Sequence, residues 1–524
     1  THTTKLNGDI NFNYDGSTSG TKVDANVIVN LTGADSYWNG NTNVTWDYIS
    51  DKQPKPEMLK VKDFKLTIAD GAQWNPNKID GTQETYTDND KKEHVTGGDY
   101  LALNNLTLND GIINLDKDKM EGQALEIEKL SGTGGIVNTN SLKNSIKIGE
   151  LVAGDGQPTP SITVNGSGNI ADEMYKDKDN EENIAQDLAD VVTFSGKSAA
   201  DKVTTDEGII AGRYEFDVDD GGNVAKSSYT KNTKNEAISN MASIGLMSWR
   251  AQNNDMNKRL GELRNSNGEH GVWARMVRGE SEYGAQNVKN QYNIYQLGYD
   301  EKLSTNDNWT VGAAISYSEG NSSFEYGSGE DKSTGFAVYG SYLGDNGEFV
   351  DLIAKYARLD NEFDVTGGVG SGDYSTNGYS FSAEYGKRNE LANDFYFEPQ
   401  VELTYGRVAD VDFVTKNGAK VSQDSMDSLV GRVGFAAGKN IKNGNVYVRA
   451  SYLYDFDGET NVTFSNAGAS ESFSEDLGGG WFEFGIGTNI NLSDATYLYF
   501  DVEKTTGGEV DTNWQWNAGV RYSF

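Results

Sequence analysis

The chain has 524 residues and a formal net charge of −34, a balance that disfavours nucleic acid as a partner because a phosphate backbone would be repelled. Its length predicts two or three domains, and its 61 Gly, 6 Pro, 28 Tyr and 20 Phe favour a protein rich in strands and turns. It has no cysteine, and no apolar run approaches the ~18–20 residues of a transmembrane helix.

The first part, residues 1–233, has short apolar stretches separated by Gly, Asn and Asp. They recur at short intervals, and we expect no helix between them: Val27–Leu31, Leu66–Ile68, Tyr100–Leu108, Ile112–Leu115, Leu125–Ile127, Ile146–Val152 and Ser161–Val164. This spacing favours the rungs of a parallel β-helix, in which each rung packs on its neighbours. A β-sandwich is the alternative. The segment Tyr175–Asn183, with the sequence YKDKDNEEN, predicts a charged and exposed loop.

The middle part, residues 234–270, shows a helical period instead. The residues at that spacing are Ala237, Ile238, Met241, Ile244, Leu246, Met247, Trp249 and Met256. The polar continuation NNDMNKRLGELR adds the basic residues Lys258, Arg259 and Arg264. Such a helix suits the inside of a barrel lined with carboxylates. The charge pattern fits an exposed amphipathic linker equally well.

The last part, residues 271–524, repeats a period of two. Twelve stretches have it: Trp273–Glu282, Tyr292–Lys302, Trp309–Phe324, Ser333–Leu343, Phe349–Glu362, Asn377–Lys387, Phe395–Ala409, Asp427–Lys439, Asn445–Asp457, Gly480–Asn491, Thr496–Lys504 and Asn513–Phe524. In the seventh, Phe397, Val401 and Leu403 alternate with Glu398, Gln400 and Glu402. One such strand would suit a soluble sheet. Many of these strands have charges on one face, and the sequence has no second apolar layer that could cover their apolar faces. This combination predicts a twelve-stranded transmembrane barrel with a polar lumen.

The terminal strand has aromatics near both ends of its apolar face. Phe524, Tyr522 and Trp514 lie on that face, whereas Arg521 and Asn517 lie on the other. We therefore expect Phe524 at the membrane edge and the polar side chains in the lumen. Connections between the twelve strands alternate short and long, as periplasmic turns and extracellular loops do.

Sites for turnover catalysis and for metal are not expected. The chain has no GxSxG and only three histidines, His2, His94 and His270, so a serine-protease triad is improbable. The acidic run Asp217–Gly222 misses the EF-hand spacing, and there is no Cys/His cluster. We expect no metal and no cofactor. An enzyme activity in residues 1–233 is left open, although no residue pattern supports one, and any protease domain would lie upstream of Thr1. No signal peptide begins at Thr1, so either a signal has been removed or the chain is a fragment of a longer precursor.

The three parts in this order resemble a type Va autotransporter. The barrel stretches that carry the resemblance include HGVWARMVRGESEYG, EFVDLIAKYARLDNEF, FYFEPQVELTYGRV and the terminal WNAGVRYSF; LEIEKLSGTGGI and EGIIAGRYEFDVDDGGNV are similar to the family's autochaperone region. The resemblance implies an all-β chain with a passenger region over 1–233, a linker helix over 234–270 and a translocator barrel over 271–524. It implies a monomeric barrel in the outer membrane of a Gram-negative bacterium, in contact with lipid, the β-barrel assembly machinery and periplasmic chaperones. The passenger would reach the cell surface or be secreted.

The linker motif QNNDMNKRLGELR is similar to that of the serine-protease autotransporters. That likeness implies passenger release between Asn253 and Asn254 by a single-turnover autoproteolysis. The side-chain nitrogen of Asn253 would attack its own carbonyl carbon, close a succinimide and expel the amine of Asn254. An amide nitrogen is a poor nucleophile, so a carboxylate must take its proton, directly or through water.

The resemblance points to two lumen carboxylates and to the chain end as further functional residues. Asp351 in EFVDLIAKY matches the acidic position of the fifth strand, and Glu483 in WFEFGIG could assist. Both could instead be solvated or paired with basic residues of the helix. Phe524 and Tyr522 match the assembly signal of the family. An uncleaved surface adhesin with the same barrel, or a porin with an extracellular extension, are the alternative functions.

Overall fold

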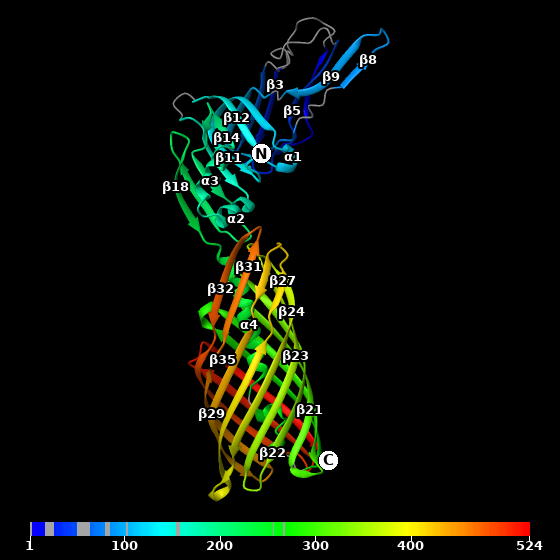
Figure 1. Ribbon diagram of the computed structural model, residues 1–524, viewed down its shortest axis with the longest axis vertical. Coiled ribbons are helices and arrows are strands. Elements are labelled where there is room, and N and C mark those ends of the chain that lie inside the picture. The colour runs from blue at the N-terminus through cyan, green and yellow to red at the C-terminus, as the bar shows by residue number, and fades with distance from the viewer. Residues whose placement is uncertain are drawn as a thin grey trace. The chain divides into compact units, whose positions relative to one another are not determined.

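The computed structural model describes residues 3–15, 26–49, 63–78, 84–100, 103–153, 158–254, 256–265 and 268–524. The chain forms two compact units. One comprises Thr1–Asn232 with Ala467–Ala469, and the other comprises Thr233–Asn466 with Ser470–Phe524. Strands dominate both units (Figure 1). No helix among the described residues combines the length and apolarity that a membrane crossing requires.

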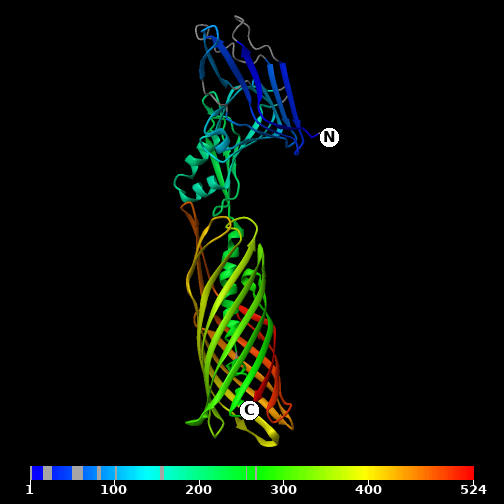
Figure 2. The ribbon, with the colours of Figure 1, turned by 90° about the vertical axis from the view of Figure 1, so that its right-hand side faces the viewer.

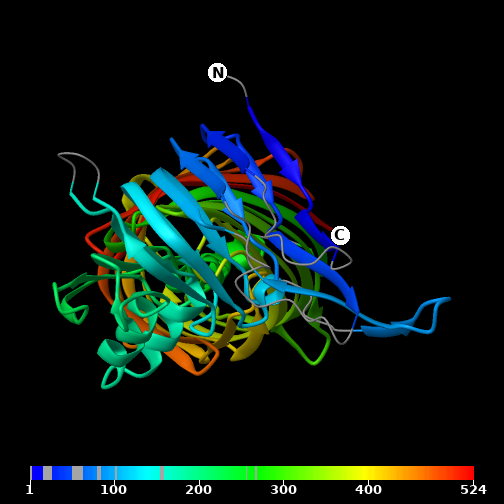
Figure 3. The same ribbon diagram turned by 90° about the horizontal axis from the view of Figure 1, so that it is seen from above.

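The first unit is a stack of parallel strands (Figure 3). Its strands are β1 Lys5–Asn7, β2 Ile10–Asp15, β3 Asn26–Thr32, β4 Tyr37–Asn39, β5 Thr42–Ile49, β6 Asp63–Ala69, β7 Gln73–Asn75, β8 Glu84–Thr87, β9 Glu93–Tyr100, β10 Asn105–Leu115, β11 Ala124–Thr139, β12 Ser145–Leu151, β13 Ser161–Gly166, β14 Val192–Phe194, β15 Lys197–Ser198, β16 Lys202–Thr205, β17 Arg213–Val218 and β18 Val224–Thr230. The run β1-β4-β7-β10-β11-β13-β16 is parallel throughout, and β3-β6-β10 and β11-β12-β14 are also parallel. The pairs β16–β17–β18 and β5–β9–β8 are antiparallel. The expected β-helical arrangement is confirmed.

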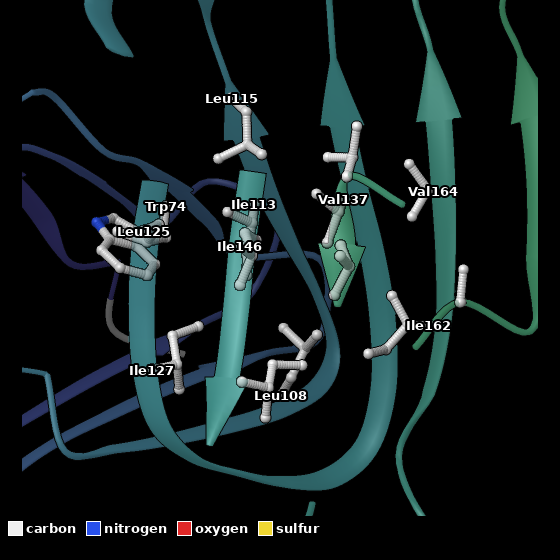
Figure 4. Packing of buried hydrophobic residues seen from close by; sticks show 14 of the residues in the cluster. Trp74, Leu108, Ile113, Leu115, Leu125, Ile127, Val137, Ile146, Ile162 and Val164 are labelled. Atoms are coloured by element: carbon white, nitrogen blue, oxygen red, sulfur yellow. The ribbon is translucent and has the colours of Figure 1, made fainter. Parts of the chain in front are cut away.

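The interior of the stack is apolar because alternate residues of each strand point inward. Figure 4 shows Leu108, Ile113, Val137, Ile162 and Val164 from successive strands projecting into one core, and all five are buried. Trp38 and Trp74 stack there with ring centroids 5.6 Å apart. The expected strands fall in β3, β6 and β9–β13, although residues 101 and 102 of one of them lie outside the described residues.

The expectation of no helix between these strands is wrong at one place, because α1 Lys117–Met120 lies between β10 and β11. Two further helices, α2 Gly168–Lys176 and α3 Glu181–Ala189, follow β13. The predicted loop Tyr175–Asn183 is in fact the short connection between α2 and α3, together with the ends of both helices. Ile170 and Met174, four residues apart, are buried on one face of α2. A nine-residue helix offers only two turns of such a pattern, too few to stand out among charged neighbours.

A ladder of asparagines follows the rungs of the β-helix. The Nδ2 of each side chain donates to the Oδ1 of the asparagine one rung before it, at 2.8, 2.6, 2.7, 2.8 and 3.1 Å in chain order. This asparagine ladder consists of Asn7, Asn39, Asn75, Asn114, Asn138 and Asn165. Parallel, in-register strands bring identical side chains into line, so the ladder fixes the register of each rung.

The second unit is a closed antiparallel barrel of twelve strands, as predicted. They are β19 His270–Tyr283, β20 Val288–Leu303, β21 Asn306–Phe324, β22 Gly327–Leu343, β23 Glu348–Val365, β24 Gly372–Lys387, β26 Phe395–Val408, β29 Met426–Ile441, β30 Gly444–Asp455, β33 Gly479–Asn491, β34 Thr496–Thr506 and β35 Val510–Ser523. Each pairs with its neighbours in this order, and β19 pairs with β35 to close the ring. Every predicted stretch corresponds to one of these strands.

The two faces of the barrel differ as the alternation predicts. In β26, Leu403 is 51% exposed on the outer face whereas Glu402 is 7% exposed. In β33 and β34, Phe484 and Phe500 are exposed while Glu483 and Asp501 are buried. The apolar outer face suits lipid, and the ionisable side chains gather in the lumen.

Two of the long connections between barrel strands contain short strands that the sequence does not predict. The segments are β27 Val411–Val414 and β28 Lys420–Gln423 in one loop, and β31 Glu459–Asn466 and β32 Ala469–Asp476 in the other. They form a four-stranded antiparallel sheet in the order β27-β28-β31-β32. The remaining short elements are β25 Asn389–Glu390 and the 3₁₀ turns η3 Thr233–Asn235, η4 Leu263–Asn265, η5 Gly284–Gln286 and η6 Ala392–Asp394.

The linker lies inside the barrel. Figure 2 shows α4, Glu236–Gln252, within the ring of strands, and it contacts β20, β21, β22, β23 and β26. Apolar residues around α4, among them Ile244, Leu246 and Trp249, are buried. The helix ends at Gln252, and a four-residue helix α5, Met256–Arg259, follows. The alternative of an exposed linker helix is therefore wrong.

Candidate functional site

Asn253 and Asn254 lie at the break between α4 and α5, inside the lumen. Asn253 caps the C-terminus of α4, and its Nδ2 donates to the backbone oxygen of Trp249 at 2.9 Å. The hydroxyl of Ser380 in β24 donates to Oδ1 of Asn253 at 2.8 Å. The guanidinium of Arg275 in β19 donates to Oδ1 of Asn254 at 3.0 Å. The peptide bond between the two asparagines is thus held from opposite walls of the barrel.

A cavity of about 100 Å³ adjoins the two asparagines. Both side chains line it, together with Glu402, Glu483 and Glu503 from three different strands. A water molecule needs roughly 10–15 Å³ of such space and a few polar partners, so the cavity has room for water beside the scissile bond. The arrangement supplies what an amide cyclisation requires: a confined bond, carboxylates and water.

The glutamates of this cavity differ in how strongly they are paired. Glu483 accepts from Arg432 at 2.7 Å and lies 3.1 Å from Arg449. Glu402 accepts from Arg259 at 3.2 Å through Oε1. Its Oε2 is buried and receives no hydrogen bond from the described residues, with Nε of Arg432 at 3.6 Å.

Sequence reasoning missed Glu402 as a candidate proton acceptor. The signal was present, because Glu402 has the same lumen-facing parity in FYFEPQVELTYGRV as Glu398. Parity shows which face a side chain occupies, but it does not show which helix residue lies opposite.

Asp351 lies on the lumen face, as its parity predicts, and is fully buried. Its carboxylate is bound by Arg264, at 2.5 Å, and by the hydroxyl of Ser341. Asp351 does not line the cavity that the asparagine pair shares with Glu483. The structure therefore brings Glu483 to the pair and places Asp351 in an ion-pair cluster with Arg264, Glu384 and Glu398.

The basic residues of the linker are neutralised by lumen carboxylates. Lys258 pairs with Asp501 at 2.8 Å and with Glu503, and Arg259 pairs with Glu402. Charges this deep in a membrane-spanning barrel are tolerated only when paired or hydrated. The pairs fix residues 256–265 against the strands and so fix the position of the break. No metal-ligand cluster occurs among the residues that the structure describes.

The chain end closes the barrel wall. The backbone N–H of Phe524 donates to the oxygen of His270 at 2.8 Å, and the N–H of His270 donates back at 2.9 Å. The rings of Tyr522 and Phe524 stack 5.7 Å apart on the outer face, where Phe524 is 56% exposed. Arg521, pointing into the lumen, donates to Asp300 at 2.9 Å.

A closed antiparallel barrel with an apolar outer face and a helix in an ionised lumen is an outer-membrane β-barrel with an occupied pore. Residues 272–503 match the protein family described as Autotransporter beta-domain. Residues 272–503, most of the barrel, therefore belong to the autotransporter β-domain family, and a barrel of this family lies in the outer membrane and translocates a passenger.

Relatives and solved structures of the same kind are similar to parts of the chain. The serine protease EspP of Escherichia coli is 30% identical over 452 residues, which cover 83% of this chain and 32% of that protein. The serine protease SepA autotransporter of Shigella flexneri is 32% identical over 301 residues, 55% of this chain and 22% of that protein. The chain thus spans about a third or less of the length of these relatives.

Two solved structures are also similar to part of the chain. The β domain of the Bordetella autotransporter BrkA has a TM-score of 0.41 and 25% identity, over 49% of this chain and all (100%) of that chain. The transport unit of AIDA-I from Escherichia coli has a TM-score of 0.46 and 18% identity, over 56% of this chain and 100% of that chain.

Proposed function

We propose that the chain delivers a β-helical passenger, residues 1–233, to the cell surface and releases it by cleaving the Asn253–Asn254 peptide bond inside the barrel. Residues 234–270 act as the linker and residues 271–524 as the translocator. The observation that carries the proposal is the position of the pair: a break in the lumen helix beside a cavity of about 100 Å³ that carboxylates share. Any activity of the passenger, or any extracellular ligand that it binds, would be a further function beside this delivery.

The reaction is an asparagine cyclisation. A carboxylate takes a proton from Nδ2 of Asn253, and the nitrogen attacks the carbonyl carbon of the same residue. The bond to the nitrogen of Asn254 then breaks, and that nitrogen receives the proton and becomes a free amine. The passenger ends in a succinimide, which water from the cavity opens to Asn or isoasparagine. The hydrogen bond from Nδ2 to Trp249 must open first, since this bond points the nitrogen back along α4.

Three carboxylates are candidates for the proton acceptor. Glu402 and Glu483 line the cavity. Oε2 of Glu402 receives no hydrogen bond from the described residues, and this makes Glu402 the better placed of the two. Asp351, to which the family resemblance points, would have to leave Arg264 to reach the pair. Substituting each by its amide, one at a time, and measuring the rate of release ranks the three.

Asn253→Asp should leave an uncleaved precursor, because the side chain then has no nitrogen to close the ring. Asn254→Asp is the matched control: it keeps the nucleophile and should be released. Intact-mass measurement of membranes and medium reads out both variants, and the wild-type passenger should be found partly as a species lighter by one water molecule. Release of Asn253→Asp at the same bond would refute the cyclisation.

A surface adhesin that stays attached is the second candidate, and the resting hydrogen bond from Asn253 to Trp249 favours it. An outer-membrane fraction that holds only full-length chain, with no new N-terminus at Asn254, would establish it.

We further propose that the β-barrel assembly machinery, helped by periplasmic chaperones, reads the aromatic chain end at Tyr522 and Phe524. The exposed, stacked rings of these residues support the proposal, since a recognition element must be accessible before insertion.

A further inference from the structure

The side-chain oxygens of three consecutive linker residues are each held by a donor from the barrel wall. Oε1 of Gln252 accepts from Lys355 of β23 and from Ser333 of β22, both at 2.9 Å. Oδ1 of Asn253 accepts from Ser380, and Oδ1 of Asn254 accepts from Arg275. Three donors come from the adjacent strands β22, β23 and β24 and the fourth comes from β19, so the scissile bond is held from two parts of the wall.

Lys355 is unusual among the lumen cations. It is 5% exposed, its ammonium lies 5.2 Å from the ring centroid of Trp249, and no carboxylate among the described residues forms an ion pair with it. Burying an unpaired ammonium in a membrane-spanning segment is costly, and such residues mark functional sites. Among the described linker residues, its hydrogen-bond acceptor is Gln252, the residue directly before the proposed nucleophile.

We infer that Ser380, together with the Lys355–Gln252 contact, is positioning machinery for the proposed cleavage, on which this inference rests. Loss of a proton from Nδ2 of Asn253 leaves an imidate whose negative charge resides largely on Oδ1. A hydroxyl that donates to that oxygen stabilises the charged form and makes the nitrogen a better nucleophile. Lys355 and Ser333 hold the preceding residue, so that the backbone carbonyl of Asn253 stays within reach of the nitrogen.

Ser380→Ala in the full chain should slow cleavage about 10- to 100-fold, the loss expected when one donor to a developing anion is removed. Ser380→Thr keeps the hydroxyl and should restore the rate, which a merely structural defect would not predict. Ser382→Ala is the matched control. Ser382 lies on the same face of β24 and accepts a hydrogen bond from Arg259 at 3.0 Å, but it donates to neither Asn253 nor Asn254. Pulse-chase conversion of precursor to product measures the rates, and heat-modifiable mobility checks that each barrel is folded.

A second measurement tests the contact between Lys355 and Gln252 by comparing the release rates of single and double variants. Gln252→Ala and Lys355→Met should each slow release, and the double variant should be no slower than Gln252→Ala alone, because that substitution already removes the contact with Lys355. Additive losses would overturn the role of this contact.

Two results distinguish failure of the proposed cleavage from failure of the positioning role alone. A wild-type chain that is never cut at Asn253–Asn254 refutes the proposed function itself. A wild-type chain that is cut, together with a folded Ser380→Ala variant cut at the same rate, refutes the positioning role alone.

Discussion

His94 of β9 lies between two carboxylates of the first unit. Its Nδ1 is 2.8 Å from Asp47 and its Nε2 is 3.0 Å from Asp88, while its ring stacks on Tyr86. These hydrogen bonds, first that of Asp47 and then that of Asp88, raise the pKa of His94 because they favour the imidazolium. The contact therefore stabilises the β8–β9 hairpin fully below the ordinary pKa of about 6.5, and this contribution is lost as the pH rises through the raised pKa.

An NMR titration of His94 in the full chain should show a pKa above its ordinary value. Asp47→Asn should lower that pKa, since it removes the largest cause of the shift. Amide exchange in β8 and β9 should be slower below the ordinary pKa of histidine than above the raised one. A pKa of His94 at or below the ordinary value in the wild type would show that Asp47 and Asp88 do not stabilise the imidazolium.

The lumen residues show how far single positions can be predicted from sequence. The parity of Asp351 and Glu483 places both carboxylates in the lumen, and both are there. Their partners could not be predicted, because the period of a strand does not specify which residue of the linker lies at the same height. Arg264 rather than Asn253 meets Asp351 for that reason.

At the scale of elements, the length of a helix or strand determines whether it can be predicted from the sequence. The long barrel strands alternate over ten or more residues, so all twelve could be predicted. The short helices α2 and α3 and the loop strands β27 and β28 offer only a few residues each, and their patterns are lost among charged neighbours. The asparagine ladder also stayed hidden, because its members are 24 to 39 residues apart and align only once the rungs are stacked.

Asn138→Ala should destabilise the β-helix more than Asn7→Ala. Asn138 donates to Asn114 and accepts from Asn165, whereas Asn7 at the end of the ladder has a single ladder bond. Each net hydrogen bond is worth about 1 kcal/mol, so the central variant should lose about 2 kcal/mol and the terminal one about half of that. Denaturant-dependent proteolysis of residues 1–232 in the detergent-solubilised chain measures both. Equal losses would show that the ladder does not act as a connected array.

At the scale of the whole molecule, the order of strands in the chain is the order around the barrel, and closure depends on the two ends of that sequence meeting. β19 and β35 pair along their length, and the last pair of hydrogen bonds is that between His270 and Phe524. Alternation in the sequence predicts the number of strands. The sheet closes into a ring because β19 and β35 each have one unpaired edge until they pair with each other.

Deletion of Phe524 should strongly reduce barrel insertion, because it removes both the closing backbone hydrogen bonds and the exposed aromatic end. Phe482→Ala is the control, since Phe482 is a similarly exposed aromatic, 51% against 56%, near the start of β33 and away from the closing strand pair. The measurement is the fraction of heat-modifiable protein in outer membranes. Normal insertion of the deletion variant would rule out a role for the chain end in assembly.

The ion pairs between the linker and the barrel wall lie almost entirely on the C-terminal side of the Asn253–Asn254 bond. Among the described residues, α4 has a single ion pair, from Arg250 to Asp455, whereas Lys258, Arg259 and Arg264 pair with carboxylates of six strand positions. A cut at this bond would therefore separate a helix that has one ion pair with the wall from a segment that several ion pairs hold in the lumen. Buried pairs are screened little by dissolved salt, so the remaining segment would keep the pore shut across a wide range of ionic strength. Secretion would then end without opening a leak in the permeability barrier of the cell.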